Sequence, residues 1–161
     1  MKQTLAILFL GLALTTTFAD EADDREAVMS VIHSFFSNMT AKDIASMQQI
    51  MTEDGILYGY RESPEGLKEF SLTHASYLEN LAKHEGVPVE RIWDAEIKLH
   101  DRIAVVWTPY DFHNDGVFSH CGMNTFSMLK GDDGWKITGV VFSVQTEGCA
   151  ESPLGPFGAS E

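Results

Sequence analysis

The fold is decided by residues 103–147, which read IAVVWTPYDFHNDGVFSHCGMNTFSMLKGDDGWKITGVVFSVQTE. Two turn signals, Asn114-Asp115-Gly116 and Gly131-Asp132-Asp133-Gly134, separate three segments in which apolar and polar residues alternate. Alternation with a period of two is typical of strands. We therefore predict a three-stranded antiparallel meander whose two-residue turns are Asp115-Gly116 and Asp132-Asp133.

These two turns determine a cross-strand register. The register places Asp111 opposite His120, and His120 opposite Gln145, with all three side chains on one face of the sheet. Further along the strands the same face aligns Pro109, Gly122 and Ser143, then Trp107, Asn124 and Val141, then Val105, Phe126 and Gly139, and finally Met128 with Ile137. One end of this face is polar and the other is apolar, which favours a pocket mouth at one end and a closed core at the other.

The part of the chain before the meander carries mainly helical patterns. Apolar residues recur at helical spacing after the acidic residues near Asp23, and Thr40 is suited to cap a second helix. Gly86 and Pro88 are typical of a helix end. In chain order, we expect a helix over residues 23–39, a helix over 41–51, a short strand over 55–61, a helix over 63–84 and a strand over 91–99. Helices that cover one face of an antiparallel sheet make an α+β domain.

The first residues have the pattern of a signal peptide. Lys2 precedes an apolar run from Leu5 to Leu14, and Thr17-Phe18-Ala19 provides small residues for cleavage. This apolar run is shorter than the roughly 20 residues that a membrane-spanning helix needs. We therefore expect a signal peptide over residues 1–19, one domain over 20–149 and a disordered tail over 150–161. The mature protein is expected to be periplasmic or secreted, without attachment to a membrane.

The chain is acidic, with a net charge of −13 that becomes −14 when Lys2 is removed. This charge would repel phosphate backbones and anionic lipids, which argues against nucleic acid and membrane surfaces as partners. The sequence has no nucleotide-binding glycine loop, no nucleophile elbow and no strong metal-ligand spacing. We therefore expect neither a cofactor nor a metal.

The two cysteines, Cys121 and Cys149, are candidates for a disulfide in an oxidising compartment. In the predicted register Cys121 faces Val144, which leaves Cys149 five residues further along, or roughly 17 Å at strand rise. A bridge between them would need a sharp chain reversal, which Gly148 permits. Free thiols and pairing between two chains are the alternatives.

The order of elements resembles that of the nuclear transport factor 2-like superfamily, over about residues 23–149. The most specific local marks are Asp133-Gly134-Trp135-Lys136-Ile137 and Phe118-Ser119-His120-Cys121-Gly122, and the second is similar to secreted, largely uncharacterised members. The superfamily includes ketosteroid isomerases, scytalone dehydratase and polyketide cyclases of the SnoaL type. The resemblance implies a conical barrel of helices packed on a curved, mainly antiparallel sheet, with a pocket between them. It also implies a homodimer built through the outer sheet face, but no single chemistry.

The candidate site residues lie at the polar end of the meander. Asp111 beside His120 would raise the imidazole pKa and allow proton exchange with a substrate, although a simple cross-strand ion pair is the alternative. His113 could complete a metal site with this pair, but the spacing is not that of a metal motif. The other expected ligand-binding residues are Trp107, Asn124, Gln145, Tyr58 and Tyr60.

The sequence thus predicts an exported domain that binds a small, partly apolar molecule in a pocket between sheet and helices. Two alternatives remain open. One is a cofactor-independent isomerase, cyclase or dehydratase that uses Asp111 and His120 for proton transfer. The other is a structural dimer module without a ligand.

Overall fold

The computed structural model describes residues 13–63 and 66–158. In this part of the chain there are three helices and seven strands. They are α1 (Ala13–Ala41), α2 (Ile44–Ile50), β1 (Met51–Ser63), β2 (Gly66–Thr73), α3 (His74–Lys83), β3 (Pro88–Ile92), β4 (Glu96–His100), β5 (Ile103–Asn114), β6 (Val117–Gly131) and β7 (Gly134–Val144).

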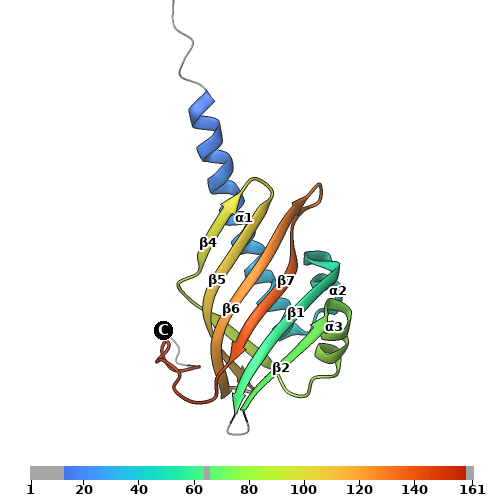
Figure 1. Ribbon diagram of the computed structural model, residues 1–161, viewed down its shortest axis with the longest axis vertical. Coiled ribbons are helices and arrows are strands. Elements are labelled where there is room, and N and C mark those ends of the chain that lie inside the picture. Colours follow the sequence, from blue (N-terminus) through green and yellow to red (C-terminus); the bar gives the residue numbers. More distant parts are fainter. Residues whose placement is uncertain (1–12, 64–65, 159–161) are drawn as a thin grey trace, which may run out of the picture.

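The strands form one curved sheet in the order β2-β1-β7-β6-β5-β3, and β4 also pairs with β5. All pairs are antiparallel except β1 with β7. Figure 1 shows α1 running behind the strands, with α2 and α3 beside β1. The predicted α+β class, with helices packed on one face of a curved, mainly antiparallel sheet, is confirmed.

The core lies between α1 and the concave face of the sheet. From α1, Val28 and Ile32 are fully buried, and the rings of Phe35 and Phe36 meet Phe126 of β6 at centroid distances of 5.6 and 5.8 Å. Alternation along the strands sends every second side chain into this core, as Ala104, Val106 and Thr108 show on β5. The helix α1 therefore packs on the same inner sheet face that forms the core.

Both predicted turns of the meander are confirmed, but the register between the strands is not. Asn114 pairs with Val117 and Gly131 with Gly134, as two-residue turns require. A β-bulge then leaves Ser119 without a partner on β5, and a second bulge does the same to Thr138 opposite β6. Each bulge shifts the pairing beyond it by one residue.

The shifts change the predicted face for β5 and for the part of β7 beyond Thr138. Asp111 pairs with Cys121, not with His120, and His120 pairs with Phe112. Trp107 pairs with Thr125 instead of Asn124. Only the pairing of Met128 with Ile137, which precedes the second bulge, agrees with the prediction. On β5 the core-facing side chains are consequently the even-numbered ones.

The predicted helix over residues 63–84 is wrong in its first half. Residues 66–73 form β2, an edge strand that pairs with β1 from Ser63–Gly66 to Ile56–Thr73. Pairing with β1 supplies a hydrogen-bonded ladder that outweighs the local helical pattern. The helix starts only at His74, where the side chain of the preceding Thr73 accepts a hydrogen bond from the Ser76 amide.

Smaller boundary errors occur elsewhere. The helix predicted over 41–51 begins at Ile44 and is capped by Asp43 instead of Thr40. The strand predicted over 91–99 is two strands, β3 and β4, separated near Asp94, whose φ is 45°. The first helix is longer than expected and is described from Ala13 onward.

The predicted signal peptide over residues 1–19 falls largely outside the described residues, which begin at residue 13. Within the part of the chain that the structure describes, no helix is long and apolar enough to cross a membrane. The signal peptide therefore stays a prediction.

Cys121 and Cys149 form an intramolecular disulfide, with their Cα atoms 6.0 Å apart. The bulged register pairs Cys121 with Gln145, and the chain then reverses through Gly148, which has a φ of 69°. The sequence analysis noted that Gly148 permits such a reversal, but the sequence alone did not require it. Of the alternatives left open, the structure selects the bridge within one chain.

The C-terminal tail, expected to be disordered, follows a defined path as far as residue 158. The Phe157 ring stacks on His113 at a centroid distance of 4.5 Å, and Arg91 Nη1 donates a hydrogen bond to the Gly155 carbonyl at 3.0 Å. The composition of the tail suggested disorder, but the disulfide starts it beside the sheet and an aromatic side chain holds it there.

Replacing both cysteines by serine should lower the free energy of unfolding by about 3–4 kcal/mol, because the bridge closes a loop with a sequence separation of 28 residues. Urea unfolding of Cys121→Ser/Cys149→Ser and of the oxidised wild type measures the difference. Reduced wild type is the matched control and should resemble the double variant. Equal stabilities, together with two titratable thiols in the untreated wild type, would contradict the bridge.

Candidate functional site

A partly open cavity of about 150 Å³ lies between the concave sheet face and the helices α1 and α3. Its lining is mostly aromatic and aliphatic, with only a few polar side chains. The residues are Phe35, Met39, Leu57, Tyr77, Glu90, Tyr110, Phe112, His120, Asn124, Phe126, Val140 and Phe142. A cavity of this volume is large enough for a benzene-sized group. Apolar walls with a few convergent polar groups are typical of a small-molecule site.

Glu90 is the main polar group of this cavity. It lies on β3 opposite Phe112, and its carboxyl group accepts a hydrogen bond from Asn124 Nδ2 at 2.6 Å. Burial raises the pKa of Glu90 to about 8; the hydrogen bond from Asn124 offsets part of this rise, and the nearby negative charge of Asp111 adds to it. At pH 7 Glu90 is therefore predominantly a neutral carboxylic acid, which both donates and accepts hydrogen bonds.

His120 enters the same cavity from β6. Its ring stacks on Phe112 at a centroid distance of 4.8 Å and meets the edge of Tyr110 at 5.8 Å. Its Nδ1 lies 3.0 Å from the Ser119 hydroxyl. Burial lowers the pKa of His120 to about 4, and the positive charge of Arg61 lowers it further. The imidazole is therefore neutral at pH 7.

Two tyrosines complete the polar lining. The Tyr110 hydroxyl donates to the Ser143 carbonyl at 2.7 Å and is thereby occupied. Tyr77 of α3 stacks on Phe35 at a centroid distance of 6.0 Å, and its hydroxyl makes no hydrogen bond to another described residue. Burial raises the pKa of both phenols, with the charge of Glu90 as the second cause, so both remain protonated. Tyr77 is thus a free donor beside the cavity.

Of the predicted site residues, the cavity lining contains His120 and Asn124. Trp107, Tyr58 and Tyr60 lie on the outer face of the sheet, where Trp107 is 48% exposed. Gln145 lies at the sheet end, where it pairs with Cys121 through its backbone. The expected acid-base pair is not formed, because the bulge at Ser119 places Asp111 on the face opposite to His120.

Asp111 has a different set of neighbours on the outer face. It accepts hydrogen bonds from Arg91 Nε at 2.9 Å and from Arg91 Nη2, and it lies 3.6 Å from His113 Nδ1. Asp111 and His113 are 5% and 4% exposed, because the tail with Phe157 covers them. This cluster anchors the tail. The three-residue metal set considered from the sequence is not assembled, and the described residues contain no other group of three potential ligands.

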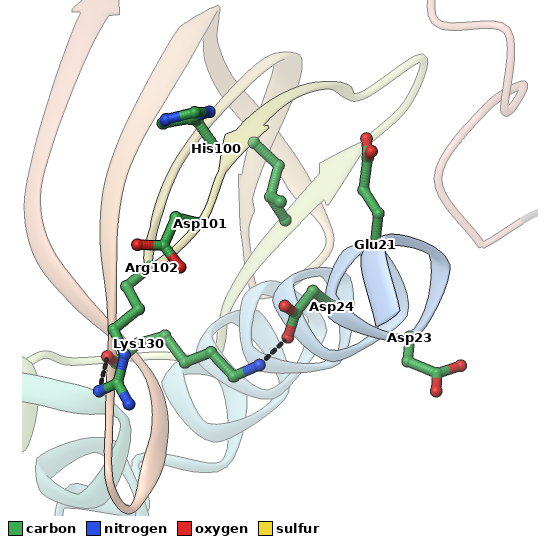
Figure 2. Close-up of a pocket in the computed structure, with 8 residues that line it drawn as sticks. Glu21, Asp23, Asp24, His100, Asp101, Arg102 and Lys130 are labelled. Carbon is green, nitrogen blue, oxygen red and sulfur yellow. Dashed lines mark hydrogen bonds and ion pairs between the residues drawn. The ribbon is translucent and has the colours of Figure 1, made fainter. Parts of the chain in front are cut away.

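A larger hollow, of about 850 Å³, lies between residues 21–24 of α1 and the β4–β5 turn. Figure 2 shows its charged lining, in which Lys130 contacts Asp24. Glu21 and Asp101 are exposed, and Glu21 accepts hydrogen bonds from Arg25. Asp24 also accepts a hydrogen bond from Trp135 Nε1 at 3.0 Å, so its role is to tie α1 to the β6–β7 hairpin. We favour the smaller cavity as the site, because Asn124 and Tyr110 are buried in its lining, with the half-buried Glu90 and His120 in the same lining. These polar groups converge on one space whose walls are otherwise mostly apolar.

Sequence analysis missed Glu90 because it lies just before the strand predicted to start at residue 91. A signal was nevertheless present on β6, where Asn124 alternates with the apolar residues Phe126 and Met128. A buried amide requires a hydrogen-bond partner, so a polar residue on the opposite wall was implied. Nothing in the sequence specified which residue that would be.

Comparison by sequence finds no match, either among models of known families or among curated proteins. Comparison of structures finds close similarity to several solved proteins. One is a nuclear transport factor 2-like protein with a cystatin-like fold from Novosphingobium aromaticivorans, with a TM-score of 0.67 and 13% identity over 88% of this chain and 94% of that one. The chain has the nuclear transport factor 2-like fold.

Two further solved structures agree with this fold. A nuclear transport factor 2-like superfamily protein from Salmonella enterica has a TM-score of 0.63 and 14% identity, covering 81% of this chain and 96% of that one. A similar protein from Cytophaga hutchinsonii has a TM-score of 0.63 and 11% identity, covering 74% and 97%. At these identities the nuclear transport factor 2-like neighbours establish the architecture, and function must be argued from the cavity.

Replacing Glu90 by glutamine should remove a pH dependence of stability. The folded-state pKa of Glu90, about 8, lies above its ordinary value of 4.5, so its contribution is complete below pH 4.5 and is lost as the pH rises through 8. Relative to Glu90→Gln, the wild type should lose up to about 1.4 kcal/mol per pH unit within this window. Urea unfolding from pH 4 to 9 measures the difference.

His120 has the opposite effect: because its pKa is lowered from 6.5, its contribution to stability increases as the pH rises toward 6.5. This contribution is present in both the wild type and Glu90→Gln, so it cancels in the comparison. Parallel stability curves for the wild type and Glu90→Gln would show that Glu90 ionises normally in the folded state.

Proposed function

We propose that this protein binds a small, partly apolar molecule in the cavity between the sheet and the helices, with Glu90 as the polar anchor. The observation that carries the proposal is the Glu90–Asn124 hydrogen bond in a wall that is otherwise mostly aromatic and aliphatic. A carboxyl group in such a place costs stability, so natural sequences retain it mainly where it serves a ligand or a specific network. The open space beside this group supports a ligand over a purely structural dimer module.

The chemistry of the lining defines the ligand class. The walls from Phe112, Phe126 and Phe142 suit a planar or aliphatic body of benzene size. A protonated Glu90 can donate a hydrogen bond to a carbonyl or hydroxyl oxygen, and the free Tyr77 hydroxyl can do the same. A small ketone or phenol therefore matches both the shape and the polarity of the cavity.

Acetophenone is a suitable first probe, because it combines a benzene ring with one carbonyl acceptor. We expect the wild type to bind it, and Glu90→Leu to bind it roughly five- to tenfold more weakly through loss of one hydrogen bond. Trp107→Leu is the matched control, since Trp107 lies on the outer face and should leave binding unchanged. Chemical-shift changes of the His120 ring, followed by NMR during titration, measure both affinity and location.

The absence of binding by acetophenone and by phenol would contradict the proposed ligand class. A stronger effect of Trp107→Leu than of Glu90→Leu would place the site on the outer face instead.

A cofactor-independent enzyme is the second candidate, and the opposite pKa shifts of Glu90 and His120 favour it. At pH 7 the cavity holds a protonated carboxylic acid and a neutral imidazole, which are a general acid and a general base. Glu90 would polarise a carbonyl while His120 removed a proton from the adjacent carbon. The acetophenone samples, prepared in D₂O, test this step: methyl-proton exchange that His120→Gln abolishes would support it, and no exchange above buffer would exclude it for this probe.

We also propose that the chain is exported, cleaved after Ala19 and paired through its outer sheet face. The sequence pattern supports cleavage, and the exposed apolar side chains of Tyr58, Val105, Trp107 and Val141 support burial against a second copy. Native mass spectrometry of the protein isolated from the exported fraction should give twice the mass of a chain that begins at Asp20. A monomer, or a chain that retains residues 1–19, would refute the corresponding part.

A further inference from the structure

Arg61 and Lys68 form an unusual pair at the end of the sheet near the cavity. They are directly opposite each other on the antiparallel strands β1 and β2, and both are exposed. Like charges in directly opposed positions destabilise a sheet. Neither side chain makes an ion pair or hydrogen bond with another described residue, although the chain carries a net charge of −13. This pair is an uncompensated positive site on an acidic protein.

The alternation of the strands turns this cation pair toward the concave face of the sheet. On β1 the inward residues are Leu57 and Gly59, so Arg61 is the next on the same side. The Phe70 ring covers Gly59 and meets Phe142, a cavity residue, at a centroid distance of 5.5 Å. A continuous surface therefore leads from the aromatic cavity through Phe142 and Phe70 to the two cations.

The position of Arg61 relative to His120 supports the same arrangement. Arg61 pairs with the buried Val144 of β7, and β7 separates β1 from β6, so Arg61 and β6 are two strand spacings apart, or roughly 10 Å. The charge of Arg61 is close enough to lower the pKa of His120. The guanidinium group thus lies on the side of the cavity where His120 enters.

We propose that Arg61 and Lys68 bind the carboxylate of a small aromatic acid whose ring occupies the cavity. This inference rests on the proposed function and names the class of its ligand. A guanidinium matches a planar carboxylate in a bidentate geometry, and the adjacent ammonium adds a second donor. The space in the cavity, about 150 Å³, is enough for the ring of the ligand but not for its carboxylate as well. The carboxylate would therefore remain at the exposed end, beside the two cations.

The other ionisable groups around the cavity are compatible with an anionic ligand. Glu90 is protonated at neutral pH and does not repel a carboxylate. Glu62 and Glu69 lie on the alternate positions of β1 and β2, so their side chains face the outer side, where Glu69 contacts the Tyr58 hydroxyl at 3.3 Å. The two strands therefore separate positive charge on the inner face from negative charge on the outer face.

The test compares phenylacetate with phenylacetamide, which has the same shape without the charge. Wild type should bind phenylacetate roughly tenfold more tightly than the amide at low salt, and the preference should shrink as salt is added. Arg61→Gln and Lys68→Gln should each reduce this preference, and the double variant should abolish it while amide binding is retained. Lys98→Gln, an exposed lysine on β4, is the charge-matched control and should preserve it. Isothermal titration calorimetry at pH 7 gives all the affinities.

The outcomes separate the two proposals. Equal binding of acid and amide by the wild type, or an acid preference that survives in the Arg61→Gln/Lys68→Gln double variant, overturns the carboxylate site and leaves the ligand-binding cavity intact. Failure of both compounds to bind overturns the cavity proposal and this inference together. If Lys98→Gln lost the preference for phenylacetate to the same extent, the preference would be explained by the net charge of the protein. That result would also overturn the inference.

Discussion

Two β-bulges control which side chains of this protein reach its interior. The residues left unpaired, Ser119 and Thr138, each shift the pairing of β6 with a neighbouring strand by one position. Because side chains alternate between faces, a shift by one residue exchanges the inner and outer faces of the segment beyond it. The bulges place Tyr110 and Phe112 beside His120 in the cavity and move Asp111 to the outer face. The cavity, the tail-anchoring cluster and the disulfide all depend on this register.

The sequence was informative about what is local and repetitive. Turn chemistry identified both hairpins, and strand alternation with helical periodicity identified an α+β domain. What could not be predicted was decided by contacts distant in sequence. The segment that forms β2 has a helical sequence pattern, and it is a strand because it pairs with β1. The two bulges could not be predicted either, because nothing in the sequence at Ser119 or Thr138 indicates a bulge. Glu90 was missed for a related reason, since its importance arises from Asn124, 34 residues away.

The interior combines two ionisable groups that are both neutral at pH 7, for one physical reason. Burial in an aromatic environment disfavours charge, so it raises the pKa of the Glu90 carboxyl and lowers that of the His120 imidazole. The charged groups lie instead at the periphery: Arg91 with Asp111 on the outer face, and Arg61 with Lys68 at the inner end of the sheet. A ligand with an apolar body and one charged end would match this distribution. The fold alone, shared at low identity with many proteins, does not specify such a ligand.

The most direct test of this account is the ionisation of Glu90 itself, measured as the ¹³C chemical shift of its side-chain carboxyl in the folded protein from pH 3 to 9. The account predicts that the signal remains that of a protonated acid through pH 7 and changes only near pH 8, with a further shift when Asn124 is replaced by alanine. A transition near 4.5 that is insensitive to Asn124→Ala would contradict it, because Glu90 would then be an ordinary solvated carboxylate and not the anchor of a buried site.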